Sequence, residues 1–182
     1  MTESNRSEKR GTFHVKRLNR ILAMLLSEMK DLTDEGRDLP IRWNIMHMYS
    51  SSQLAKLLAI HRGMDAEMAG IAAALHDIGV VMTKKHEGHA EVAPQYVYDF
   101  LEKYNRESEG RLPKVIKEEM DTIVNAIIQH SEKEIYSDDP FVELLRDVDS
   151  LDAYLHGVKI EGGRLERSQR VMKELGIAFP QR

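Results

Sequence analysis

The chain has 182 residues, 42% of them hydrophobic, which is typical of one domain with a buried core, here expected to span 1–182. Its formal net charge of −4 disfavours broad nonspecific binding, so we expect neither a nucleic-acid polymer nor a membrane as partner. The absence of cysteine excludes disulfides, thiolate metal sites and cysteine nucleophiles. The most apolar stretch, 69–75, is too short to cross a bilayer, and the polar, flexible start over 1–11 lacks the apolar region of a secretory signal. We therefore expect a soluble cytoplasmic protein.

Apolar residues recur at helical spacing in nearly every segment, and no alternating stretch is long enough to indicate a sheet. The predicted fold class is therefore all-α. A first helix carries an apolar face from Val15 to Met29, and a second runs over 44–61 with Asn44 as its cap. The third, rich in alanine, spans 65–78, and Gly79 is the predicted stop.

The second half of the chain continues the helical pattern. A polar connection over 82–88 leads into a helix whose apolar stripe covers 92–101, and Pro94 leaves its start open by one turn. After a charged loop, Pro113 is the predicted first residue of a helix that reaches His130.

Two further helices complete the predicted bundle. Asp139 and Pro140 have the residue types of a cap and a first helical position, for a helix that extends through His156. A glycine pair at 162–163 is expected to break the chain before a last helix over 164–175.

His76 and Asp77 are consecutive near the end of the most apolar helix. An unpaired carboxylate buried there is costly, so Asp77 needs a cation or several hydrogen-bond donors. Adjacent side chains diverge by about 100° on an ideal helix, but near a helix end both can reach one metal ion. The alternative is a capping or hydrogen-bonded pair in the core.

Two more residues extend this candidate site. His47 and Asp149 lie on inward-looking faces of their predicted helices, far from the His-Asp pair in sequence. Two imidazoles and two carboxylates from three helices match the ligands that first-row transition metals prefer when sulfur is absent. Each residue alone has a structural interpretation, and only the combination favours a metal site.

The order His47, then His76-Asp77 within Leu-His-Asp-Ile-Gly, then Asp149 within Asp-Val-Asp-Ser-Leu-Asp-Ala, resembles the HD superfamily of metal-dependent phosphohydrolases. The resemblance covers about 41–156, which would be the core of an HD-domain helical bundle. It implies that Asp149, rather than Asp147 or Asp152, is the last metal ligand, with Asp147 as the first competitor to test.

His89 and His130 lie between the His76-Asp77 pair and Asp149, where two-metal members of this superfamily place histidines. The residues after His89 are also similar to a pattern in dinucleoside tetraphosphate hydrolases. The resemblance thus implies a second ion held by these imidazoles, with Asp77 bridging. The alternative is a one-metal site in which His89 and His130 are solvated or in the core. Mn, Fe, Co, Ni and Zn all accept such ligands.

The implied activity is hydrolysis of a phosphoester or phosphoanhydride of a nucleotide-like small molecule by a metal-activated water, with Asp77 and His76 as catalytic residues. Arg42, Lys84 and Lys85 flank the motifs and are candidate phosphate contacts, although solvated surface charge is the simpler interpretation. The alternative function is a noncatalytic regulatory module that binds a metal or nucleotide. A homodimer is compatible with the sequence.

Overall fold

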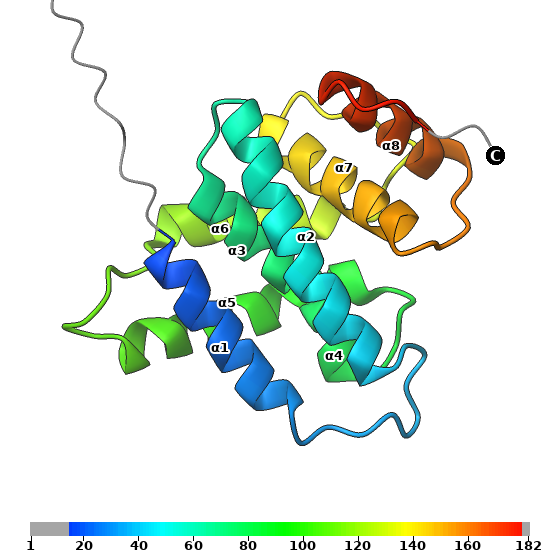
Figure 1. Ribbon diagram of the computed structural model, residues 1–182. Coiled ribbons are helices and arrows are strands. Elements are labelled where there is room, and N and C mark those ends of the chain that lie inside the picture. Colours follow the sequence, from blue (N-terminus) through cyan, green and yellow to red (C-terminus); the bar gives the residue numbers. More distant parts are fainter. Residues whose placement is uncertain (1–14, 180–182) are drawn as a thin grey trace, which may run out of the picture.

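The computed structural model describes residues 15–179, and in this range the chain forms eight helices and no strand (Figure 1). The prediction of an all-α fold is confirmed, whereas the predicted flexible segment 1–11 lies outside the described residues. The helices are α1 (Lys16–Met29), α2 (Ile41–His61), α3 (Ala66–Leu75), α4 (Ile78–Thr83), α5 (His89–Glu107), α6 (Lys117–Gln129), α7 (Pro140–Leu155) and α8 (Gly162–Glu174).

Helix α3 is the centre of the bundle. It packs against α1, α2, α6 and α7 (Figure 1), and eight of its ten residues are buried. Six of its ten residues are alanine or glycine, and such small side chains let neighbouring helices approach closely. The C-terminal end of α3 is therefore deep inside the molecule, and it carries His76.

Residues 66–83, which comprise α3 and α4, are long and apolar enough to cross a membrane by length and composition alone. Of this segment, 72% is buried inside the molecule. The two helices are separated by turn residues at 76–77. This segment thus has the character of a core element of a soluble protein.

Two predicted boundaries in the first half of the chain are wrong. Helix α2 begins at Ile41 after an extended Pro40, so Asn44 lies within the helix, where its amide donates to the Pro40 carbonyl at 3.1 Å. The predicted third helix ends at Leu75, and Gly79 lies inside α4. A Cβ at Gly79 would come within 2.2 Å of the His89 carbonyl oxygen, so this glycine permits close packing of α4 on α5.

The second half also departs from prediction at two places. Helix α6 begins at Lys117 and not at Pro113, because the chain stays extended to Ile116, whose N–H donates to the Glu119 carboxylate at 2.9 Å. Helix α8 begins at Gly162, so the glycine pair starts the helix instead of preceding it.

The predicted start of α7 is confirmed. Asp139 accepts a hydrogen bond from the Phe141 N–H at 2.8 Å, and Pro140 occupies the first helical position. This cap fixes where α7 enters the bundle, and hence which of its side chains face α2 and α3.

Candidate metal centre

The site begins at the break between α3 and α4. His76 follows α3 directly and still has a helical backbone (φ −60°, ψ −33°). Asp77 does not (φ −99°, ψ 16°), and α4 starts after it in a new direction. Because of this break, the two side chains converge, and His76 Nε2 lies 3.6 Å from Asp77 Oδ1. An uninterrupted helix would hold consecutive side chains about 100° apart.

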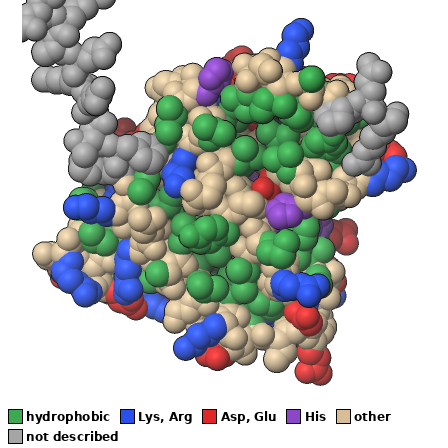
Figure 2. Space-filling model, viewed as in Figure 1, with side chains coloured by type: hydrophobic (Ala, Val, Ile, Leu, Met, Phe, Trp, Pro, Cys, Tyr) green, Lys and Arg blue, Asp and Glu red, His purple; other side chains and the backbone are tan. Residues whose placement is uncertain are grey.

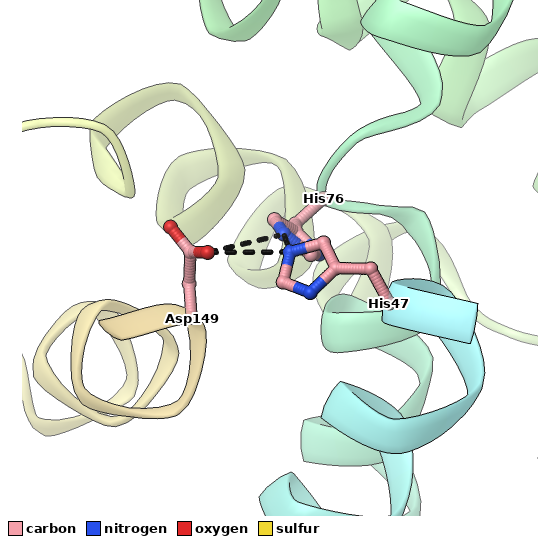
Figure 3. Close-up of side chains that lie close together, drawn as sticks. All are labelled: His47, His76 and Asp149. Atoms are coloured by element: carbon pink, nitrogen blue, oxygen red, sulfur yellow. Dashed lines mark hydrogen bonds and ion pairs between the residues drawn. The ribbon is translucent and has the colours of Figure 1, made fainter. Parts of the chain in front are cut away.

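The structure brings His47 from α2 and Asp149 from α7 to the same point (Figure 3). His47 Nε2 lies 3.1 Å from His76 Nε2 and 3.3 Å from Asp149 Oδ1. Asp77 Oδ2 lies 3.6 Å from His47 Nε2. Three stretches of the chain that are distant in sequence thus present two nitrogen and two oxygen donors to one small space.

His89 and His130 form a second pair beside the first. Their Nε2 atoms are 3.0 Å apart, and Asp77 Oδ1 lies 3.1 Å from His89 Nε2 and 3.7 Å from His130 Nε2. Asp77 therefore points one oxygen toward His47 and the other toward the second pair. This placement is compatible with a carboxylate that bridges two ions.

Hydrogen bonds to the Nδ1 atoms fix the orientation of all four rings. Three Nδ1 atoms donate to backbone carbonyls, which can only accept, so in the neutral rings the lone pair is on Nε2 and faces the centre. Two facing lone pairs about 3 Å apart repel each other unless a cation lies between them, so the donor set fits a divalent transition metal. The Nδ1 partners are Asp152 Oδ2 for His47 (2.6 Å), Ala73 O for His76 (2.7 Å), His86 O for His89 (2.6 Å) and Ile127 O for His130 (2.6 Å).

Asp149 is surrounded by positive charge on the side away from the imidazoles. Its Oδ2 lies 2.5 Å from Lys133 Nζ and 3.3 Å from a guanidinium nitrogen of Arg164. Burial raises the pKa of Asp149, but Lys133 and Arg164 outweigh that effect and hold the pKa well below its usual range. Burial in turn lowers the pKa of Lys133 to about 8, although Asp149 opposes the shift.

The two most deeply buried imidazoles favour the neutral form. Burial lowers the pKa of His76 and lowers that of His130 to about 4. For Asp77, burial raises the pKa, but the nearby imidazoles of His76, His130 and His89 hold it well below its usual value. His76 and His130 are therefore neutral nitrogen donors beside ionised oxygen donors, as metal coordination requires.

The other two imidazoles respond more strongly to the carboxylates. Burial lowers the pKa of His47, but Asp149 and Asp152 outweigh it and raise the value to about 10. Burial also lowers the pKa of His89, but the hydrogen bond to Asp77 and the charge of that carboxylate, together with smaller contributions, outweigh it and raise the pKa. Carboxylates that favour a proton on an imidazole also favour a cation beside it.

Sequence reasoning missed two residues of the site, Lys133 and Arg164, and it considered Asp152 only as an alternative metal ligand and not as the partner of His47. This role of Asp152 could have been found, because it is one helical turn from Asp149 and shares its face of α7. Lys133 is only 6% exposed, and its ammonium also donates to the His130 carbonyl. Because it lies in an irregular turn, no periodic pattern marks it as buried.

A cavity of about 680 Å³ opens above the centre. The face of the molecule drawn in Figure 2 carries patches of hydrophobic side chains, with isolated histidines among them. Apolar side chains make up much of the wall, and Arg42, Lys159 and Arg164 add positive charge. The lining residues include Pro40, Arg42, Trp43, Met46, His47, Asp77, His89, His130, Asp149, Ala153, Val158, Lys159, Ile160 and Arg164.

Of the candidate phosphate contacts, the structure places Arg42 at the cavity but turns Lys84 and Lys85 away. Lys84 has a left-handed backbone (φ 68°), and its Nζ donates to the Glu35 carbonyl at 3.1 Å. Lys85 pairs with Asp38 at 3.0 Å. Both lysines contact the loop between α1 and α2 instead of the cavity.

The fold and this centre define a class of protein. Residues 44–154 match the HD domain family, so the chain belongs to the HD-domain family, and the predicted relationship is confirmed. HD domains bind divalent metals, and the cluster described above has the side chains to hold one.

The chain is also similar to two proteins called ribonuclease Y, from Chlorobium chlorochromatii (strain CaD3) and Chlorobium phaeobacteroides (strain DSM 266 / SMG 266 / 2430). It is 26% and 27% identical to them over 159 residues. The alignments cover 86% of this chain and 26% of each relative, so the chain spans about a quarter of the length of these curated relatives. No solved structure matches the chain.

Proposed function

We propose that this protein is a metal-dependent phosphohydrolase that cleaves a phosphoester or phosphoanhydride bond in a small, nucleotide-like molecule. The observation that carries the proposal is the convergence of four imidazoles and two carboxylates at the base of a cavity. Membership of the HD-domain family supports a metal-dependent hydrolase.

The proposed first ion is held by His47, His76, Asp77 and Asp149, and the second by His89 and His130 with Asp77 shared. When bound, such an ion lowers the pKa of water toward neutrality and neutralises phosphoryl oxygens. Mn, Fe, Co, Ni and Zn are all compatible with this set of nitrogen and oxygen donors.

The side chains of the protein supply the remaining requirements. Asp77, between the two imidazole pairs and 17% exposed, can reach the cavity and accept a hydrogen bond from the attacking water. In the reaction, the oxygen of this water forms a bond to phosphorus while the bond to the leaving oxygen breaks. Asp152 holds the His47 ring through Nδ1, and Lys133 holds Asp149, so the donors are positioned before substrate arrives.

The size of the cavity supports a small substrate. Its volume of about 680 Å³ falls within the range of small-molecule sites, roughly 300–1,000 Å³. The name of the two relatives says that they cleave RNA, which supports phosphoester chemistry. The net charge of −4 disfavours binding of a long polyanion, so we propose a small nucleotide-like molecule as the substrate.

A multiple-turnover assay tests this function. Purified protein loaded with each of the five metals is given nucleoside monophosphates, cyclic nucleotides, dinucleoside polyphosphates and a short RNA, and phosphate or product release is followed. We expect turnover of a small substrate, and Asp77→Ala should abolish both turnover and metal retention while the helical circular dichroism signal is preserved. Binding without turnover would identify a regulatory module instead, and cleavage of the RNA alone would contradict a small substrate.

A further inference from the structure

Two cations contact the same oxygen of Asp149. Oδ1 faces His47, whereas Oδ2 faces Lys133 at 2.5 Å and Arg164 at 3.3 Å. The Lys133 side chain is 5% exposed, but that of Arg164 is 33% exposed and lines the cavity. The two contacts are therefore not equivalent.

Lys133 is sufficient to hold Asp149. Its ammonium is fixed from both sides, by Asp149 and by the His130 carbonyl, and it lies behind Asp149, outside the cavity lining. The Arg164 contact is longer and partly solvated, and such ion pairs contribute little to stability. Arg164 can therefore exchange Asp149 for another anion without disturbing the orientation of the carboxylate.

The backbone holds Arg164 at this place. Arg164 lies in the first turn of α8, where the Gly163 N–H donates to the Glu134 carboxylate at 2.8 Å. A Cβ at Gly163 would lie 2.5 Å from the Lys133 carbonyl oxygen, so this glycine permits the start of α8 to pack directly on the turn that carries Lys133. The two cations are thus positioned by one backbone contact.

Other basic side chains near the cavity are less suited to contact a substrate at the centre. Lys159 is 84% exposed and pairs with Glu161 at 2.6 Å. Arg42 lines the cavity and is exposed, but no ion pair with a metal-binding residue places it at the centre. Of the three permanent cations in the lining formed by described residues, Arg164 is the one in contact with Asp149.

We propose that Arg164 is a substrate-binding residue whose guanidinium contacts the phosphoryl group that undergoes hydrolysis. This inference rests on the proposed phosphohydrolase function. A planar guanidinium can donate two parallel hydrogen bonds to a phosphoryl group, which a lysine cannot do. Arg164 is bound to Asp149 before substrate enters and transfers to the phosphoryl oxygens when substrate occupies the cavity.

The test compares Arg164→Met and Arg164→Lys with Lys173→Gln, which removes one exposed positive charge from the same helix outside the cavity. Binding of inorganic phosphate to metal-loaded protein is measured by calorimetry, together with KM and kcat for the best substrate. We expect Arg164→Met to weaken phosphate binding and raise KM by about tenfold or more, as for loss of a hydrogen bond to a charged group. Arg164→Lys should recover part of the loss, and Lys173→Gln should match the wild type.

Metal affinity provides the second readout. Because Lys133 still holds Asp149, Arg164→Met should bind the metal within about threefold of the wild-type affinity. Unchanged phosphate binding in Arg164→Met would overturn the inference, and so would loss of the metal in that variant, because Arg164 would then only position Asp149.

The inference and the proposed function can fail separately. If the wild type turns over substrate but Arg164→Met has an unchanged KM and phosphate affinity, only the role of Arg164 is wrong. If the wild type shows no turnover, yet phosphate binding depends on Arg164, the anion site stands and the hydrolase function fails.

Discussion

Asp147 and Asp149 are two residues apart on α7, and both are at least 96% buried, yet they have different surroundings. Residues two apart on a helix point about 200° from each other, so the two carboxylates face opposite sides of α7. Asp147 is surrounded by guanidinium groups, those of Arg62 at 2.7 Å, Arg167 at 3.0 Å and Arg170 at 2.6 Å. Asp149 faces imidazoles on one side and Lys133 and Arg164 on the other.

The difference separates a structural carboxylate from a candidate ligand. Both oxygens of Asp147 contact guanidinium groups, and this network ties the end of α2 to α7 and α8. Asp149 Oδ1 faces Nε2 of His47 and Nε2 of His76, and in His76 the hydrogen bond from Nδ1 to the Ala73 carbonyl leaves Nε2 as an acceptor. A buried carboxylate that shares its space with acceptors requires a further cation, and this requirement favours Asp149 over its competitor as the metal ligand.

The largest expected effect on activity comes from Asp149→Asn, which keeps the shape of the side chain and removes its charge. The variant should lose the metal, and its kcat/KM should fall by more than about 100-fold. This loss is larger than the loss expected for a residue that only orients a metal ligand. Metal content by elemental analysis and steady-state kinetics measure these losses, with circular dichroism as the check on folding. Retention of metal and activity would mean that Asp149 is not a ligand.

Gly79→Ala should have the next largest effect. The new methyl group would clash with the His89 backbone, so His89 must move. Because a displacement of about 1 Å at a reacting centre costs on the order of 100-fold in rate, we expect a loss of activity of about that size. We expect the number of bound ions per chain to fall. The matched control is Gly70→Ala, whose Cβ would meet the Leu18 side chain at 2.6 Å and the Lys56 side chain at 3.1 Å and should lower stability without changing the number of ions. Equal metal content in both variants would contradict a role for His89.

Asp152→Asn tests the orientation of His47. Asp152 accepts from Nδ1 at 2.6 Å, and an amide is a weaker acceptor that can also present its NH2 group to the ring. Metal affinity should fall by about 10–100-fold, the usual cost of losing a residue that orients a ligand. A competition titration against a chelator of known affinity measures the change. An unchanged affinity would show that the His47 ring is held by other contacts.

Asp147→Asn should have the smallest effect on activity and the clearest one on stability. The substitution leaves the fully buried Arg167 facing an amide, and loss of one partner of a buried pair costs about 3 kcal/mol. The free energy of unfolding, measured by denaturant titration, should fall by about this amount, while kcat/KM of the folded protein stays within about threefold of the wild type. Loss of metal from this variant would reverse the roles assigned to the two aspartates.

The sequence predicts much of this fold because the helices carry regular apolar faces. The periodicity of α1, α5 and α7 is strong, and the order of His47, His76-Asp77 and Asp149 leads directly to the family that the comparison identifies. Helical periodicity also correctly indicates that His47 and Asp149 face inward.

The remaining features depend on contacts that no local pattern encodes. Gly79 was expected to end a helix, but its role is set by the approach of the His89 backbone from another helix. Lys133 is buried from an irregular turn, and the left-handed conformation of Lys84 directs that side chain away from the cavity. Arg164 reaches Asp149 from the first turn of α8, which starts two residues earlier than its apolar pattern indicates.

The most direct test of the metal centre is crystallographic. Crystals grown with Mn²⁺ and measured for anomalous scattering should show a peak in contact with Nε2 of His47 and His76 and with the carboxylates of Asp77 and Asp149. A second peak beside His89 and His130 would establish the two-ion form. A well-ordered crystal with no peak at this position, from protein that also gains no thermal stability from any of the five metals, would contradict the account.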